Sequence, residues 1–481
     1  MSFQDATQMA EAVRSKQVSP AELIQHTMKR VEQINPLLNA ITSTRFEQAL
    51  HEATTRSFTN EPFAGVPIFL KDLGQQREGD PDTLGSKLFQ QARATHTDYY
   101  VQRLEAMGFI IVGRSSVPEF GFKNISDSQL FGPVNLPDDV RRNAGGSSGG
   151  AAALVTSGIS PLAPASDGGG SIRIPASFNG LIGLKPTRGR IPVGPRSYRG
   201  WQGASVQFAL TQSVRDTRTL LKHFQVKQME SPFIVPRLSQ QALSQPINRP
   251  LKVAVCTQSP VGGVVSDEAI QAVQIAARFL ERQGHDVIVL DTPIIDGISA
   301  MQSYYLMNSV ETAAMFDGIE KMYQRPLTIQ DMELMTWAIY QSGQHIPAKR
   351  YTQVLATWDE YSRQMAEFHT QYDLLLTPTT ADVAPLHGQL DVPLAIQEQL
   401  RQMDKLSVDN QQALIWQMFA KSLDLTPFTQ QANLTGQPAI SLPTHRTADG
   451  LALGVQFIAA KGREDLLLAV ADLFEQHQQF K

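Results

Sequence analysis

The sequence predicts an α/β fold built on a mostly parallel or mixed β-sheet, and three observations support this prediction. An apolar run at 251–256, an amphipathic stretch at about 267–283 and an apolar run at 286–290 form a strand–helix–strand unit. Short apolar runs alternate with glycine-rich loops between about 64 and 216. Strand character returns towards the C-terminus, at 374–376, 439–443 and 454–458.

Helices are expected at both ends of the chain. Ser19 is a suitable N-cap, Pro20 suits the first helical position, and Glu22 completes a capping box. This helix is predicted to run from about 20 to about 34, where an Asn-Pro pair ends it. A final helix is predicted at about 464–477. The glutamine-rich segment at about 388–421 has no clear period, and its structure stays open.

The segment at about 297–372 is predicted to be helical and is rich in methionine and aromatic residues. Such side chains usually fill a core, but they also suit an adaptable pocket wall. We expect this region to help form a substrate funnel. The chain shows no internal repeat and no long linker, so all of 1–481 is expected to form a single domain with its catalytic core at about 64–216.

Composition disfavours several partners. The 42 basic and 46 acidic residues give a net charge of −4, and no dense Lys/Arg stripe suits a nucleic-acid backbone. The first residues lack a signal-peptide pattern, and no apolar stretch reaches the roughly 18 residues of a membrane span. We therefore expect a cytoplasmic protein, monomeric or homodimeric, that acts on a small molecule without nucleic acid or membrane.

Metal and thiol chemistry are also disfavoured. Cys256 is the only cysteine, so neither an intrachain disulfide nor a cysteine-rich metal site can form. It lies in a strand-like run, where a buried and inert thiol is typical. The ten histidines are scattered and form no H-E-x-x-H pair. No metal or cofactor is expected.

Two glycine–serine clusters and one lysine carry the chemical signal. The clusters read GGSSGG at 145–150 and DGGGSIR at 167–173, and Lys71 directly follows the apolar run 66–70. Glycines leave backbone N–H groups unshielded, which suits serines beside an anion-binding nest. Amide hydrolysis needs an activated nucleophile, donors for the oxyanion and a proton for the amine. The pattern indicates a hydrolase that uses serine but no histidine.

These motifs resemble, residue by residue, the amidase signature family of serine hydrolases. Within that family the sequence looks especially similar to the 6-aminohexanoate-cyclic-dimer hydrolase type, through 183–195 and 436–468. The resemblance implies the amidase signature fold, a central mixed β-sheet flanked by helices. It also implies hydrolysis of carboxylic amides, linear and fairly apolar or small and cyclic, through an acyl-enzyme.

The resemblance assigns three catalytic residues. It makes Ser171 the nucleophile, Ser147 a bridging serine joined to Gly146 by a cis peptide, and Lys71 the terminal base. On composition alone Ser148 is an equal candidate for the relay; only the resemblance favours Ser147, and Ser148 is expected to support the site through a hydrogen bond.

The glycines of the second cluster are expected to form an oxyanion hole, because consecutive N–H groups can converge on one point. This hole comprises Gly168, Gly169 and Gly170 with the amide of Ser171, and Gly168 stands where the family more often has threonine or alanine. Asp167 and Arg173 flank the loop and are expected to pair and brace it. The residues predicted to line the substrate pocket are Glu119, Phe120 and Asn124.

The relay requires that Lys71 be neutral at rest. Its pKa must then fall from about 10.4 by roughly three units, or about 4 kcal/mol, which burial can supply. A carboxylate at Asp72 would oppose this shift, so we expect it to point away from the amine.

Three other interpretations compete with the free amidase. Lys71 alone would most often be a solvated surface residue, with the glycine loops simple turns. A phosphate nest is disfavoured because the nucleotide-binding glycine motifs are absent. The nearest enzymatic alternative is the glutaminase subunit of a tRNA-dependent amidotransferase, which shares the same lysine and serines.

Overall fold

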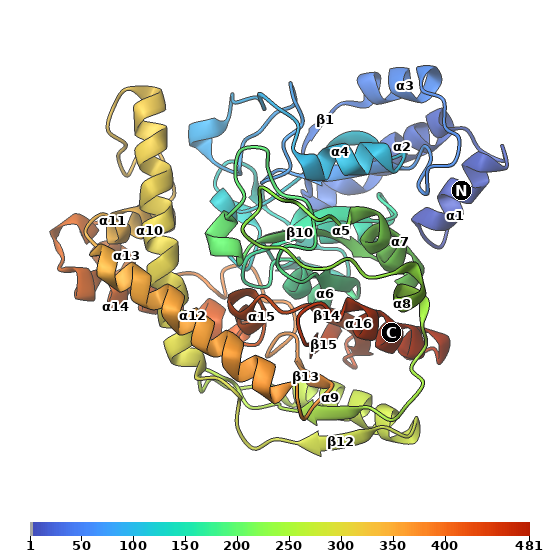
Figure 1. The fold of residues 1–481 in the computed structure, drawn as a ribbon. Coiled ribbons are helices and arrows are strands. Elements are labelled where there is room, and N and C mark those ends of the chain that lie inside the picture. The colour runs from blue at the N-terminus through green and yellow to red at the C-terminus, as the bar shows by residue number, and fades with distance from the viewer. Residues whose placement is uncertain (1–2) are drawn as a thin grey trace.

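A computed structural model describes residues 3–481 of the chain. Its centre is an eight-stranded mixed sheet in the order β12-β11-β13-β15-β14-β9-β10-β8 (Figure 1). Neighbouring strands are parallel from β12 through β11 to β13 and antiparallel beyond β13. The strands are β8 (Ala163–Asp167), β9 (Ile182–Lys185), β10 (Val206–Thr211), β11 (Lys252–Val255), β12 (Asp286–Val289), β13 (Leu374–Pro378), β14 (Ala439–Arg446) and β15 (Ala452–Ala459). The predicted mixed α/β fold is confirmed.

A second, three-stranded sheet carries the predicted lysine strand. Its order is β1-β3-β2, with β2 and β3 parallel and β1 antiparallel to β3. These strands are β1 (Ile41–Thr44), β2 (Pro67–Lys71) and β3 (Ile110–Ser115), and two small ladders pair β4 (Asp127–Ser128) with β5 (Gly132–Pro133) and β6 (Asn135–Leu136) with β7 (Asp139–Asn143). Strand β2 is buried along its whole length, and its apolar side chains directly precede Lys71.

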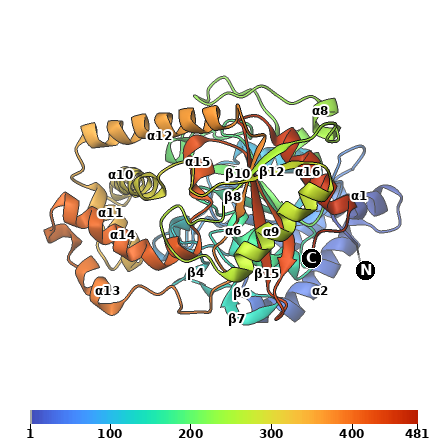
Figure 2. The same cartoon turned by 90° about the horizontal axis from the view of Figure 1, so that it is seen from below.

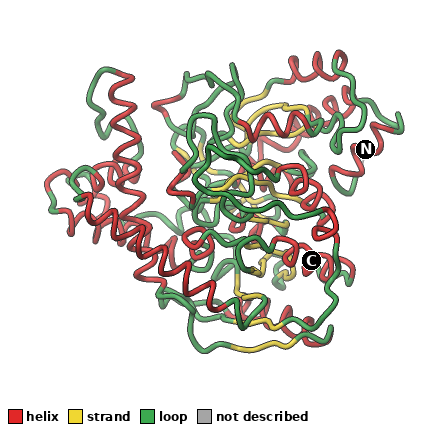
Figure 3. Tube along the Cα trace, in the orientation of Figure 1, coloured by secondary structure: helices red, strands yellow, loops and turns green. Residues whose placement is uncertain are grey.

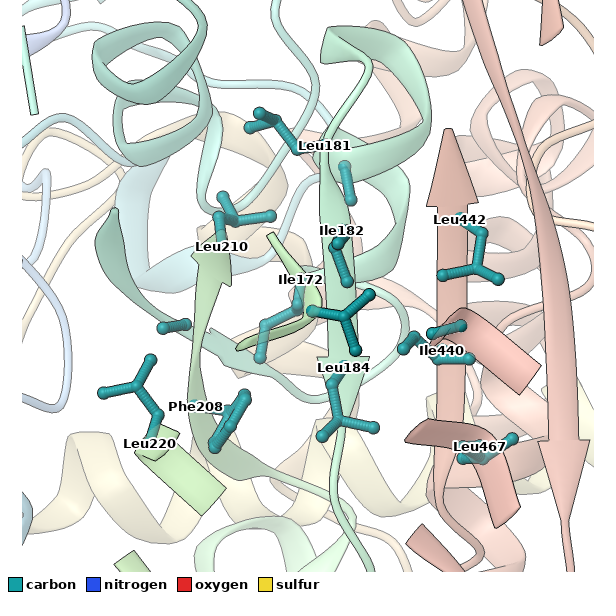
Figure 4. Close-up of a cluster of buried hydrophobic side chains, with 14 of the residues drawn as sticks. Ile172, Leu181, Ile182, Leu184, Phe208, Leu210, Leu220, Ile440, Leu442 and Leu467 are labelled. Carbon is teal, nitrogen blue, oxygen red and sulfur yellow. The ribbon is translucent and has the colours of Figure 1, made fainter. Parts of the chain in front are cut away.

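Helices cover the sheets and form the main core with them. Figure 4 shows Ile172, Leu184 and Phe208 facing one another within this core. Figure 3 shows the helices around the yellow strands. The helices packed on the sheets are α2 (Pro20–Leu38), α3 (Phe46–Thr55), α5 (Gly149–Thr156), α6 (Arg173–Asn179), α7 (Val214–Phe224), α9 (Asp267–Arg282) and α16 (Glu464–Gln476). The remaining helices outside the layer described below are α1 (Ala6–Arg14), α4 (Tyr99–Ala106) and α8 (Gln240–Ser244).

Helix α2 begins with the predicted capping box but extends further than predicted. Ser19 and Glu22 make both reciprocal bonds of the box. Helix α2 continues past Pro36 to Leu38, because the N–H of Asn39, in a left-handed conformation, closes the last turn by donating to the Asn35 carbonyl. The proline therefore lies within the last turn instead of ending the helix.

A layer of helices from the second half of the chain lies beside the sheets, opposite both termini (Figures 1 and 2). The segment 297–372 is helical as predicted. The glutamine-rich segment at about 388–421, for which the sequence supports no prediction, is mostly helical too. Their methionine and aromatic side chains form a second core cluster. The elements of this layer are α10 (Gly297–Tyr323), α11 (Leu334–Gly343), α12 (Ala348–Phe368), α13 (Leu394–Leu400), the 3-10 turn η4 (Met403–Lys405), α14 (Val408–Leu425) and α15 (Gln430–Thr435). Three further 3-10 turns come from the first half of the chain: η1 (Lys87–Phe89), η2 (Glu119–Gly121) and η3 (Gly200–Gly203).

Residues 3–481 contain neither a helix suited to cross a membrane nor a candidate metal cluster. None of the helices there combines the length and the apolar character needed to cross a bilayer. The same residues contain no group of three or more His, Cys, Asp or Glu side chains arranged to hold a metal ion.

Candidate active site

Lys71 ends strand β2 and is fully buried. The apolar residues before it pack into the core, so the strand carries the amine inward between the two sheets. Its Nζ lies 2.8 Å from Ser147 Oγ. The structure therefore brings together two of the three residues that the resemblance assigns to catalysis.

Burial sets the charge state of Lys71. Desolvation lowers the pKa of its amine from 10.5 to about 7, and the nearby Asp167 carboxylate opposes part of this shift. The Asp72 carboxylate points to Thr83 instead, accepting from its hydroxyl at 2.6 Å and its N–H at 3.2 Å. Burial raises the pKa of Asp72 to about 6. A neutral Lys71 is therefore well populated near neutral pH.

The two serines of the GGSSGG cluster take different positions. The peptide between Gly146 and Ser147 is cis, and the Ser147 side chain lies beside Lys71. Gly146 has to be glycine, because a Cβ there would lie 2.6 Å from the backbone of Ile125. Ser148 is fully buried and its hydroxyl donates to the Ser166 carbonyl at 3.3 Å.

Ser171 lies in the loop between β8 and α6, and Ser171 and Ser147 line the same cavity. Gly168 and Gly169 line it as well. The Gly170 N–H instead donates to Asp167 Oδ1 at 2.8 Å, so it does not point into the cavity, contrary to the predicted oxyanion hole. Among residues 3–481, no hydrogen-bond partner is found for the N–H groups of Gly168, Gly169 and Ser171.

Asp167 and Arg173 make the predicted pair, and both side chains are fully buried. Arg173 Nη2 lies 2.8 Å from Asp167 Oδ1. Burial alone would raise the pKa of the carboxyl, but the charge and hydrogen bonds of Arg173 hold it well below its usual range. The N–H groups of Gly170 and Ile172 also donate to this carboxylate. The ion pair therefore fixes the loop that carries Ser171.

Sequence reasoning missed several residues that hold this site. Ser166 Oγ lies 2.8 Å from Lys71 Nζ, and Ser166 immediately precedes the second cluster, a position that could have drawn attention to it. The others come from distant segments and give no local signal. They are Tyr304, which donates to the Gly168 carbonyl, Thr429, which donates to the Gly169 carbonyl, and Asn433 and Gln456, which contact Arg173.

The cavity has a volume of about 470 Å³. Phe120 and Asn124 line it, as predicted, but Glu119 does not. The Glu119 carboxylate accepts from the Ser86 hydroxyl at 2.6 Å and from the Glu333 N–H at 2.8 Å. Burial raises its pKa, and its role is to join the 83–89 loop to the helical layer.

The cavity walls differ in polarity. An apolar wall comes mainly from the helical layer and the loops that face it, and it includes Phe120, Phe122, Trp201, Met301, Tyr305, Met315 and Phe419. A polar rim comes from the segments around β2 and β10, and it includes Gln76, His96, Asp98, Arg196 and Gln207. Arg196 is exposed, so this rim reaches solvent.

The chain is similar in sequence to several known proteins. The sequence profile of the family described as Amidase matches residues 22–468. A lipoamidase of Enterococcus faecalis is 40% identical over 477 residues, covering 98% of this chain, which spans only 63% of that relative's length. A 6-aminohexanoate-cyclic-dimer hydrolase of Paenarthrobacter ureafaciens is 35% identical over 481 residues, covering 98% of this chain and 94% of the relative.

Solved structures show the same likeness. The structure of 6-aminohexanoate cyclic dimer hydrolase complexed with substrate aligns with a TM-score of 0.88 at 34% identity, covering 98% of this chain and 96% of the other. A glutamyl-tRNA(Gln) amidotransferase chain from Thermotoga maritima aligns with a TM-score of 0.73 at 24% identity, covering 95% and 91% of the two chains. That second likeness concerns the fold alone.

Proposed function

This chain belongs to the amidase family of amide hydrolases, and on that basis we propose that it cleaves its substrates with Ser171 as nucleophile, Ser147 as proton bridge and Lys71 as base. One observation carries the proposal: a buried amine with a pKa of about 7 lies 2.8 Å from a serine hydroxyl that shares a cavity with Ser171. An amine of this kind can accept a proton near neutral pH, whereas an ordinary lysine cannot.

The reaction proceeds through an acyl-enzyme. Ser171 Oγ bonds to the amide carbon while its proton moves to Ser147 Oγ and the Ser147 proton moves to Lys71 Nζ. The carbonyl oxygen becomes an oxyanion, stabilised by the N–H groups of Gly168, Gly169 and Ser171. The proton then returns through Ser147 to the amide nitrogen, and the C–N bond breaks to release the amine.

Water completes the cycle by the same route. A water molecule attacks the ester carbon of the acyl-enzyme while its proton passes through Ser147 to Lys71. Collapse of the second oxyanion breaks the bond to Ser171 Oγ, which regains its proton through Ser147. The carboxylic acid then leaves as its carboxylate, and the free enzyme is restored.

The substrates are proposed to be carboxylic amides with a linear, fairly apolar acyl part, or small cyclic amides. The apolar wall of the cavity and the names of the two relatives support this class. In this proposal the whole chain works as a single domain, with the helices of 297–372 as one wall of a substrate funnel. The proposed enzyme is cytoplasmic, monomeric or homodimeric, and acts without nucleic acid or membrane; the net charge of −4 supports the part of this proposal that concerns nucleic acid.

Covalent labelling tests the nucleophile. A fluorophosphonate should inactivate the wild type and add its mass to the peptide that contains Ser171. Ser171→Ala should lose both labelling and turnover while its circular dichroism stays native. Turnover at the wild-type rate in this variant would refute the assignment.

The choice between the two neighbouring serines has its own test. Ser147→Ala should lower kcat by several orders of magnitude, whereas Ser148→Ala should lose far less, because Ser148 only donates to the Ser166 carbonyl. The opposite order of losses would exchange the two roles.

A substrate panel separates the free amidase from the glutaminase alternative. The purified chain should hydrolyse aryl amides, lactams or dipeptide amides on its own. Preference for glutamine, with activity that requires a second protein, would instead support the amidotransferase alternative.

A further inference from the structure

The Lys71 amine has three oxygen neighbours, and two of them belong to one residue. Nζ lies 2.8 Å from Ser147 Oγ, 2.8 Å from Ser166 Oγ and 3.5 Å from the Ser166 carbonyl oxygen. Residues 3–481 supply no other hydrogen-bond partner for this nitrogen. Asp167 is the charged group that acts on the Lys71 amine, and its carboxylate is paired with Arg173.

Counting hydrogens leaves two arrangements of these contacts, with the amine lone pair facing either Ser147 Oγ or Ser166 Oγ. A neutral primary amine carries two N–H groups and one lone pair, whereas a carbonyl oxygen can only accept and a hydroxyl can do both. The carbonyl must therefore receive an N–H. If Ser166 Oγ receives the second N–H, the lone pair is left facing Ser147.

We propose that Ser166 is a positioning residue that orients the lone pair of Lys71 towards the Ser147 hydroxyl, an inference that rests on the proposed function. Without the Ser166 hydroxyl, the amine can rotate about its Cε–Nζ bond and direct an N–H at Ser147. Such an amine cannot take the Ser147 proton until it turns back. The geometry thus makes Ser166 a determinant of kcat.

Ser166 is itself held in place. It lies in β8, where it pairs with Gln207 of β10, and its carbonyl also accepts from Ser148 Oγ at 3.3 Å. The next residue, Asp167, is fixed by its buried ion pair. The backbone of Ser166 therefore has little freedom, and Ser148 supports the site by orienting the Ser166 carbonyl.

The same oxygens serve the charged state. After Lys71 takes the proton, its third N–H faces Ser147 Oγ, and the other two keep their acceptors on Ser166. Hydrogen bonds from an ammonium are stronger than those from a neutral amine. Loss of the Ser166 hydroxyl should therefore destabilise protonated Lys71 more than neutral Lys71.

The test compares Ser166→Ala, Ser166→Cys and Ser166→Thr across pH. Ser166→Ala should lower the plateau kcat about tenfold to a hundredfold with KM nearly unchanged, the loss expected for one hydrogen bond to a charged group. The acid limb of its pH–kcat profile should move to lower pH by about one unit, because the Lys71 ammonium has lost an acceptor and its pKa falls. Ser166→Cys should behave similarly, since its sulfur is only a weak acceptor. Ser166→Thr should restore both kcat and the acid limb.

Controls separate this inference from the proposed function. Ser205→Ala removes a hydroxyl that lines the same cavity without contacting Lys71, and its acid limb should stay in place. If Ser166→Ala changes only KM, or if both deletion variants match the wild type while Lys71→Ala is inactive, Ser166 does not position the base. If Lys71→Ala itself retains the wild-type rate, the proposed mechanism fails as a whole.

Discussion

Arg173 and Asp167 form an ion pair in which both side chains are completely buried, with Nη2 and Oδ1 2.8 Å apart. Removing the guanidinium would leave a carboxylate in the interior without its counter-charge. We expect Arg173→Ala to lower the free energy of unfolding by about 3 to 5 kcal/mol and to reduce turnover, because the Ser171 loop loses its brace.

Urea unfolding and steady-state kinetics measure these effects. The matched control is Arg363→Ala, which breaks exposed pairs with Glu360 and Glu367 on α12 and should cost less than about 1 kcal/mol. Equal costs in the two variants would contradict a bracing role for the buried pair.

The pH dependence of turnover should report the protonation of Lys71. Catalysis needs the neutral amine, and its pKa of about 7 means that protonation grows below this pH. We expect kcat to fall about tenfold per pH unit on the acid side of pH 7 and to level off above about pH 8. Initial rates from pH 5 to 9 measure this profile, and a profile flat down to pH 5 would exclude a neutral lysine base.

The stability of the protein should depend on pH through the same group. In the unfolded chain Lys71 binds a proton up to about pH 10.5, but in the folded protein it releases this proton near pH 7. Between these values the unfolded state binds more protons, so stability rises with pH. Relative to Lys71→Met, the wild type should gain about 1.4 kcal/mol per pH unit.

Unfolding midpoints of the two proteins at pH 7, 8 and 9 measure this difference. Because other groups titrate alike in both proteins, they cancel in the comparison. A constant gap between wild type and Lys71→Met would show that Lys71 keeps its ordinary pKa in the folded state.

The helical layer should limit the size of the acyl group. Met315 of α10 lines the cavity, whereas Met322 on the same helix is 61% exposed and lies outside the cavity lining. We expect Met315→Trp to lower kcat/KM at least tenfold, or about 1.4 kcal/mol, for amides with long acyl chains and much less for short ones.

A series of anilides from acetyl to octanoyl measures this selectivity. Met322→Trp makes the same change in side-chain volume at a site that should not meet substrate, and it should keep the wild-type selectivity. Equal losses for all chain lengths in Met315→Trp would indicate a general disturbance of α10 instead of a pocket wall.

Local sequence patterns predicted the elements that depend on interactions between residues close together in the chain. The capping box at Ser19 acts within one turn of helix, and the strand–helix–strand unit at 251–290 follows from adjacent periodic runs, so both are present. The end of α2 was wrong because a left-handed Asn39 closes a turn beyond Pro36, which propensity rules do not anticipate. Gly170 was misjudged because its N–H meets a carboxylate instead of the cavity.

The order of amino acids alone specifies which groups are available for chemistry: a lysine after an apolar strand, serines between glycines, and an acid and a base six residues apart that can pair. How these groups behave depends on the folded chain. Packing between the two sheets removes water from Lys71 and lowers its pKa, and folding brings Ser166 to the amine and Tyr304 and Thr429 to the glycine loop. Desolvation and hydrogen-bond geometry depend on distances between segments far apart in the chain, which no local pattern encodes.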